Sequence, residues 1–121
     1  MSHITLIKPE TEIRNIDLLN AAAKSLGLQL TESNIVRGYG GTKRTADVVW
    51  RVNEKYDIGA LKMEDGTYRL LADWWGVGEA LKDKLVKEYQ AQKVLKEAKI
   101  LGHKLKSKTV LPDMIEIRLL V

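Results

Sequence analysis

The stretch from residue 36 to residue 76 constrains the fold most, because it joins a regular strand pattern to a hairpin signal. Between residues 45 and 52 apolar and polar side chains alternate, and Trp50 lies on the apolar face. Farther along, Asp65-Gly66 is flanked on both sides by strand-like segments, and an Asp-Gly pair is typical of a two-residue hairpin turn. This stretch therefore predicts several antiparallel strands joined by short turns.

A two-residue turn predicts one register for this hairpin. The expected pairs are Met63 with Tyr68, Leu61 with Leu70, and Gly59 with Ala72. This register keeps the apolar residues on one face, whereas a three-residue turn would set Leu61 against Arg69. It also pairs Lys62 with Arg69, and this like-charge pair is expected to face water or an anion.

Helical periodicity marks a segment before this stretch. Apolar residues recur at helical spacing from residue 16 to residue 26. Thr11 or Asn15 is expected to cap the helix at its start, and Gly27 to end it. One side of this helix is therefore predicted to face the core.

A second, longer helix is predicted from Glu79 to Leu101. Its charged residues, Lys87 and Glu88 among them, are expected to face solvent. A short strand opens the chain, and a hairpin around Pro112 ends it. Together these elements predict an α+β fold: an antiparallel sheet built from hairpins, with two helices packed on one face, in a single domain of residues 1–121.

Composition excludes several classes of protein. The chain has no cysteine, so it forms no disulfide and no thiolate zinc site. No apolar run approaches the ~20 residues that a membrane span needs, and the N-terminus lacks the pattern of a signal peptide. The net charge of +4 permits an anionic partner. We expect a location in a cytoplasm or a plastid stroma (or in a host cytoplasm, if phage-encoded), with no membrane and no cofactor.

Aromatic residues indicate a binding surface near the hairpin. In Asp73-Trp74-Trp75-Gly76, strand alternation predicts that Trp74 faces the core and that Trp75 faces the opposite way. An exposed tryptophan can anchor a protein interface or stack on a base. The alternative is that Trp74 continues the core face of its strand while Trp75 covers the start of the second helix. The residues assigned to the candidate binding surface are Arg37, Tyr39, Asp47, Arg51, Asp73 and Trp75.

Cations suggest contacts with an anion or a nucleic acid. The segment 38–44 combines glycines with two cations but lacks the Walker spacing, and the alternative is a flexible bend with solvated cations. Three lysines alternate along the first strand of the last hairpin, where they could neutralise phosphates or protect an edge strand. The possible contacts are Lys43, Arg44, Lys62, Arg69, Lys104, Lys106 and Lys108.

Three carboxylates lie near the aromatic residues: Asp47, Asp57 and Asp73. If they converged, they could bind a divalent cation or act as acid and base. However, no histidine stands in this stretch, and the spacing matches no metal motif. The alternative is that each carboxylate bonds backbone N–H groups or one of the arginines Arg37 and Arg51.

Residue strings along the whole chain resemble a known family. The most specific are Tyr56-Asp57-Ile58-Gly59 and Ala72-Asp73-Trp74-Trp75-Gly76, and further matches are Val36-Arg37-Gly38-Tyr39 and Asp65-Gly66-Thr67-Tyr68. They are similar to the hypothetical plastid reading-frame family (number thirty-five of that series) of red-algal plastids and cyanobacteria, a family of unknown function. The chain departs from the family pattern at Pro112-Asp113-Met114, where the family has a glycine-containing turn. The resemblance implies a small soluble protein whose genes often lie beside ATPases of the AAA class, and it supplies no catalytic residues.

Three functions follow as hypotheses. The first is a non-enzymatic protein-interaction module whose partner is plausibly an AAA-class ATPase. The second is a nucleic-acid-binding protein that uses the basic residues, and the third is a metal-assisted hydrolase built on the three carboxylates.

Overall fold

A computed structural model describes residues 2–7 and 12–121, so Thr11 lies outside the described residues. Its helices are α1 (Ile16–Ser25), the single turn α2 (Trp74–Val77) and α3 (Glu79–Ile100), with a short 3₁₀ helix η1 (Tyr39–Gly41). Its strands are β1 (Ser2–Ile7), β2 (Gln29–Leu30), β3 (Ile35–Arg37), β4 (Lys43–Thr45), β5 (Val48–Arg51), β6 (Asp57–Lys62), β7 (Tyr68–Ala72), β8 (Lys104–Val110) and β9 (Ile115–Leu120).

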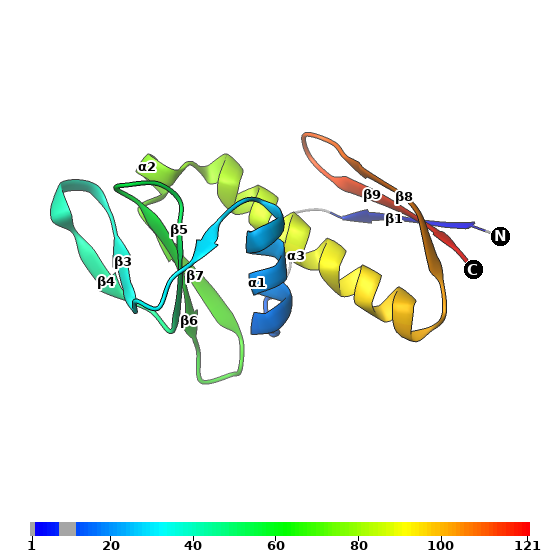
Figure 1. Ribbon diagram of the computed structural model, residues 1–121, viewed down its shortest axis with the longest axis horizontal. Helices are drawn as coiled ribbons and strands as arrows, with labels where there is room; N and C mark the ends of the chain where they lie inside the picture. Colours follow the sequence, from blue (N-terminus) through cyan, green and yellow to red (C-terminus); the bar gives the residue numbers. More distant parts are fainter. Residues whose placement is uncertain (1, 8–11) are drawn as a thin grey trace.

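The predicted α+β class is confirmed, and the strands form three antiparallel sheets (Figure 1). A four-stranded sheet has the order β2-β5-β6-β7, and a three-stranded sheet has the order β1-β9-β8. The hairpin of β3 and β4 forms a separate pair. In Figure 1, α3 runs between the four-stranded and the three-stranded sheets, so one long helix joins the two halves of the molecule.

Two helices pack on one face of the four-stranded sheet, as predicted. Most buried residues of this core come from α1, α3, β5 and β6, with Leu19, Trp50, Ile58 and Leu85 fully buried. The Trp50 indole donates a hydrogen bond of 2.9 Å to the Asn20 side chain of α1. Trp50 is thus fully buried, and its N–H group, the one donor of the ring, has a partner. The ring lies at the centre of this half of the molecule.

The second core lies between α3 and the three-stranded sheet. Ala91 and Ala98 of the helix meet Ile115, Ile117 and Leu119 of the central strand β9. Because α3 is covered by this sheet as well as by α1 and the four-stranded sheet, Lys87 and Glu88 are buried, and the prediction that they face solvent was wrong. Glu88 instead accepts hydrogen bonds from Lys108 Nζ, at 2.9 Å to each carboxylate oxygen.

The ends of both long helices agree with the sequence patterns. Asn15 caps α1, since its side-chain oxygen accepts hydrogen bonds from the N–H groups of Asp17 and Leu18. Gly27 follows with φ +79°, a conformation that side chains with a Cβ rarely adopt. The boundaries of α3 agree with the prediction to within one residue.

The predicted register of the β6–β7 hairpin was wrong by one residue. Leu61 lies opposite Arg69, and Lys62 lies opposite Tyr68. Glu64, Asp65 and Gly66 form a three-residue loop in which Met63 N–H donates to the Thr67 carbonyl at 2.8 Å and Gly66 has φ +85°. The Asp65 carboxylate accepts hydrogen bonds from Thr67 N–H and Oγ1, which stabilise this loop and lower the pKa of Asp65.

The predicted strand from residue 45 to residue 52 is divided between two sheets. Residues 43–45 belong to β4 and 48–51 to β5, and the chain bends between them. Ala46 therefore packs with Val36 and Val49 in a small third core rather than with Trp50. At Gly59 of β6 the hairpin approaches so closely that an added Cβ would lie 2.4 Å from Val36 Cγ2. The β3–β4 hairpin thus covers the second face of the four-stranded sheet.

Candidate functional site

The most exposed aromatic residues of the described chain lie side by side. Trp75 of α2 is 85% exposed and Tyr39 of η1 is 69% exposed. Their ring centroids are 6.2 Å apart at an interplanar angle of 78°, an edge-to-face contact. We call this pair the Tyr39–Trp75 platform.

The backbone of the β3–β4 turn holds Tyr39 at the tip of its hairpin. Gly38 N–H donates to the Thr42 carbonyl at 2.9 Å, and Thr42 Oγ1 donates to the Tyr39 carbonyl at 2.7 Å. Gly40 and Gly41 have φ of +66° and +78°, so this path favours glycine at both positions. The glycine-rich segment is therefore a closed, hydrogen-bonded turn.

Asp73 joins the turn to the segment that carries Trp75. It caps α2, where Oδ1 accepts a hydrogen bond from Gly76 N–H at 3.4 Å. Its other oxygen, Oδ2, accepts one from Tyr39 N–H at 2.9 Å. One carboxylate therefore fixes both aromatic residues of the platform.

The two tryptophans face different ways, as predicted, but the predicted cause was wrong. They begin the helical turn α2 instead of continuing β7, so a helical rotation and not strand alternation separates them. Trp74 is half-buried against the main core, and Lys82 Nζ lies 5.2 Å from the centroid of one of its rings. Trp75 turns outward.

A hollow of about 450 Å³ lies beside the platform. Its walls are the turn 38–43, Trp75, Arg37 and the β5–β6 turn with Glu54, Lys55 and Tyr56. Tyr56 packs directly on α2, since a Cβ added to Gly76 would lie 2.3 Å from its ring. Sequence reasoning did not assign Tyr56 to the site. Its position within residues 36–76, where most aromatic residues lie, could have indicated that it belongs there.

Arg37 forms the inner wall and is fully engaged. Its guanidinium binds both oxygens of Asp57 at 2.8 and 2.9 Å and donates to the carbonyls of Glu54 and Asn53 at 2.7 and 3.0 Å. Asp57 is only 2% exposed. Burial raises the pKa of this carboxyl, but the hydrogen bonds from Arg37 outweigh burial, and the pKa is lowered. Arg37 thus positions the walls of the hollow and is not a free cation.

The three carboxylates of the hydrolase hypothesis have separate tasks. Asp47 Oδ2 accepts a hydrogen bond from Lys62 N–H at 2.7 Å at the far end of the sheet, while Asp57 binds Arg37 and Asp73 caps α2. Across residues 2–7 and 12–121 no three His, Cys, Asp or Glu side chains are grouped so that they could hold a metal ion. The alternative in which each carboxylate bonds backbone N–H groups or an arginine therefore describes this site.

The predicted basic stripe on the last hairpin was wrong. The register of β8 shifts between Leu105 and Ser107, so Lys106 has no partner on β9 and the alternation is broken. Lys108 turns toward α3, where it binds the buried Glu88. Lys104 and Lys106 remain exposed.

The other predicted cations lie at separate places in the fold, apart from the neighbours Lys43 and Arg44. Lys43 and Arg44 are exposed on β4, and Lys43 borders the hollow. Arg51 is exposed at the end of β5, opposite Asp57. Lys62 and Arg69 lie near the loop of the β6–β7 hairpin, where Lys62 is opposite Tyr68 and Arg69 is opposite Leu61. Of the predicted binding residues, the structure therefore brings together Arg37, Tyr39, Asp73 and Trp75.

No helix among the described residues is long and apolar enough to cross a membrane. A family model described as a protein of unknown function, DUF1257, matches residues 22–119. The uncharacterized protein ycf35 of Guillardia theta is 34% identical to the chain over 109 residues, which cover 84% of this chain and 82% of that protein. No solved structure matches the chain. These matches confirm the family resemblance, and the chain belongs to the DUF1257 family of proteins of unknown function.

Proposed function

We propose that this protein is a non-enzymatic interaction module that binds a protein partner through the Tyr39–Trp75 platform. One observation carries the proposal: a tryptophan that is 85% exposed stands in edge contact with an exposed tyrosine beside an open hollow. Exposed aromatic side chains of this kind dominate the binding energy of many protein interfaces, because they bury a large area at a small cost in side-chain entropy.

The fixed geometry of the platform supports this role. Asp73 holds both Tyr39 and the turn that carries Trp75, and the closed hairpin turn leaves Tyr39 little backbone freedom. A surface that is already ordered loses less entropy on binding than a flexible one. The platform can therefore contribute to affinity without rearrangement of its backbone.

The partner class comes from the family resemblance, which implies an ATPase of the AAA class. The location in a cytoplasm or a plastid stroma likewise stays a prediction. The hollow beside the platform is wide enough to receive a projecting apolar side chain of such a partner.

Affinity capture followed by identification of the bound proteins tests the proposal. The wild-type chain is compared with Trp75→Ala and Tyr39→Ala, and Leu101→Ala serves as a control because Leu101 is 69% exposed elsewhere on the surface. We expect Trp75→Ala to weaken the captured complex about 30-fold, as for an interface hot spot of about 2 kcal/mol. Capture that is equal for wild type and Trp75→Ala contradicts the proposal.

Nucleic-acid binding is the second candidate, and one observation favours it. Lys43 and Lys55 border the same hollow as the two aromatic rings, and single-stranded nucleic acids bind to surfaces that combine stacking rings with cations. Titration with a fluorescent single-stranded oligonucleotide separates the candidates. If no binding occurs at ~50 mM salt, the second candidate is excluded.

A further inference from the structure

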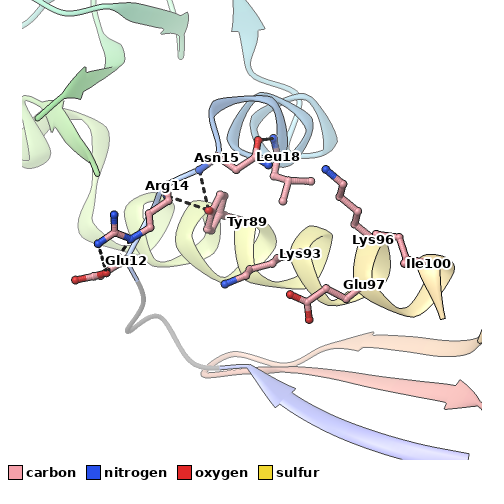
Figure 2. Close-up of a pocket in the computed structure, with 9 residues that line it drawn as sticks. All are labelled: Glu12, Arg14, Asn15, Leu18, Tyr89, Lys93, Lys96, Glu97 and Ile100. Carbon is pink, nitrogen blue, oxygen red and sulfur yellow. Dashed lines mark hydrogen bonds and ion pairs between the residues drawn. The ribbon is translucent and has the colours of Figure 1, made fainter. Parts of the chain in front are cut away.

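A second hollow, of about 630 Å³, lies between the start of α1 and the C-terminal half of α3 (Figure 2). It shares no lining residue with the hollow beside the Tyr39–Trp75 platform. Its volume falls in the range of sites that bind small organic molecules. Tyr89, Lys93 and Lys96 lie on the same face of α3, at helical positions i, i+4 and i+7, and all three line it.

The hydroxyl group of Tyr89 can offer the hollow a hydrogen-bond donor. The side chain is only 2% exposed, and its oxygen accepts hydrogen bonds from the N–H groups of Arg14 at 3.0 Å and Asn15 at 3.1 Å. These two bonds use the acceptor capacity of the phenol oxygen, so its hydrogen is left to donate. None of the described residues accepts that hydrogen.

The two lysines add positive charge to the hollow. Within the described chain neither Lys93 nor Lys96 makes an ion pair or a hydrogen bond. Figure 2 shows Lys96 extending toward Leu18 of α1 across the hollow.

The two acidic residues that line the hollow offset only part of this charge, because three cations line it as well. Glu12 is paired with Arg14 at 3.2 Å, which leaves Glu97 as the one lining carboxylate against the two lysines. The polar groups left in the hollow are therefore predominantly donors. Leu18 and Ile100 supply apolar wall at the same place.

We propose that this hollow binds a small organic anion. Its carboxylate or phosphate group lies between Lys93 and Lys96 and accepts a hydrogen bond from the Tyr89 hydroxyl, and its aliphatic part lies against Leu18 and Ile100. An ionised acceptor is the chemical group that a set of two ammonium groups and one hydroxyl donor matches, because charge-assisted hydrogen bonds are the stronger ones.

Amide NMR titrations with two probes, inorganic phosphate and octanoate, test the site and identify its head group. We expect saturable shifts at Tyr89, Lys93 and Lys96 with at least one probe. Tighter binding of phosphate assigns a phosphate head group, and tighter binding of octanoate assigns an aliphatic carboxylate. If neither probe gives saturable shifts at these residues up to about 10 mM, the proposal is overturned.

Matched lysine variants show whether binding is specific to the hollow. Lys96→Gln and Lys93→Gln are each expected to weaken binding about tenfold, as the loss of one charge-assisted contact. Lys99→Gln removes an exposed lysine of α3 that does not line the hollow and is expected to leave binding unchanged. An equal loss in Lys99→Gln and Lys96→Gln overturns the proposal, because it indicates non-specific attraction to the helix. The midpoint of thermal unfolding, measured for each variant, checks that the fold is intact.

Discussion

The central strands of the two larger sheets, β6 and β9, are covered differently. In β6 the residues from Asp57 to Ala60 are all buried, because the helices cover one face of its sheet and the β3–β4 hairpin covers the other. In β9 burial alternates: Ile115, Ile117 and Leu119 face α3, while Arg118 is exposed. A strand that is covered on both faces tolerates neither an unpaired charge nor extra volume, whereas a strand covered on one face tolerates both on its open side.

Each strand has an arginine–carboxylate pair, and removal of the arginine gives the largest expected contrast. Arg37→Ala leaves the buried carboxylate of Asp57 without its partner, so we expect a loss of about 3 kcal/mol in the free energy of unfolding. Arg118→Ala breaks the pair with Glu116, which is open to solvent, and is expected to cost less than about 0.5 kcal/mol. Urea denaturation at neutral pH measures both changes. Equal losses of stability for Arg37→Ala and Arg118→Ala would contradict the proposed effect of covering a strand on both faces.

The same pair makes stability depend on pH. The pKa of Asp57 is lower in the folded protein than in the unfolded chain. Its contribution is therefore present above the unfolded pKa of about 4 and is lost as the pH falls through the folded pKa. In Asp57→Asn we expect a shallower fall in the free energy of unfolding below about pH 4 than in wild type. A fall of equal slope in the two proteins would contradict this assignment.

A larger side chain at Gly59 of β6 is expected to cause the next largest loss of stability. A methyl group at Gly59 would meet Val36 Cγ2 at 2.4 Å and Ala46 Cβ at 2.8 Å, so Gly59→Ala is expected to cost about 2 kcal/mol. In Gly59→Ala combined with Val36→Ala, the smaller residue makes room, so the combined loss is expected to be smaller than the sum of the two single losses. Thermal or urea unfolding of the three variants measures this coupling. Additive losses would show that the hairpin does not press on Gly59.

A smaller loss of stability than for Arg37→Ala or Gly59→Ala is expected at the contact between the β3–β4 hairpin and α2. Asp73→Ala removes the cap of α2 and the acceptor for Tyr39 N–H, at a cost of about 1 kcal/mol. Because Tyr39 and Trp75 then lose their common support, partner capture should weaken even though both rings are present. Tryptophan fluorescence reports the change around Trp75, and capture that equals wild type would show that Asp73 does not order the platform.

The sequence predicted the parts of the fold that depend on neighbouring residues. Asn15 and Gly27 mark the ends of α1 by their own hydrogen-bonding and backbone preferences, and the long helix α3 follows from its apolar stripe and the glycines that flank it. The position of Trp50 in the core followed from strand alternation. The predicted exposure of Trp75 also agrees with the structure, although the local conformation is a helical turn.

The parts that the sequence did not predict depend on contacts between distant segments. The two-residue register follows only if β6 and β7 bury one face. Because the β3–β4 hairpin covers the other face, Leu61 can lie opposite Arg69, and the local bonds of Asp65 with Thr67 select the three-residue loop. The burial of Glu88 similarly requires Lys108, which lies twenty residues away on another element.

The sequence by itself determined the two long helices, most of the strands and their antiparallel pairing, because capping, turn and alternation signals act over a few residues. Its residue strings also indicated the family. Only the tertiary structure decided which of the predicted site residues meet. It brought Tyr39, Asp73 and Trp75 together and engaged Arg37 with Asp57, and it dispersed the expected lysine stripe and the three carboxylates. The physical reason is that a side chain's partners are set by the surfaces packed against its element, and these come from segments far away in the sequence.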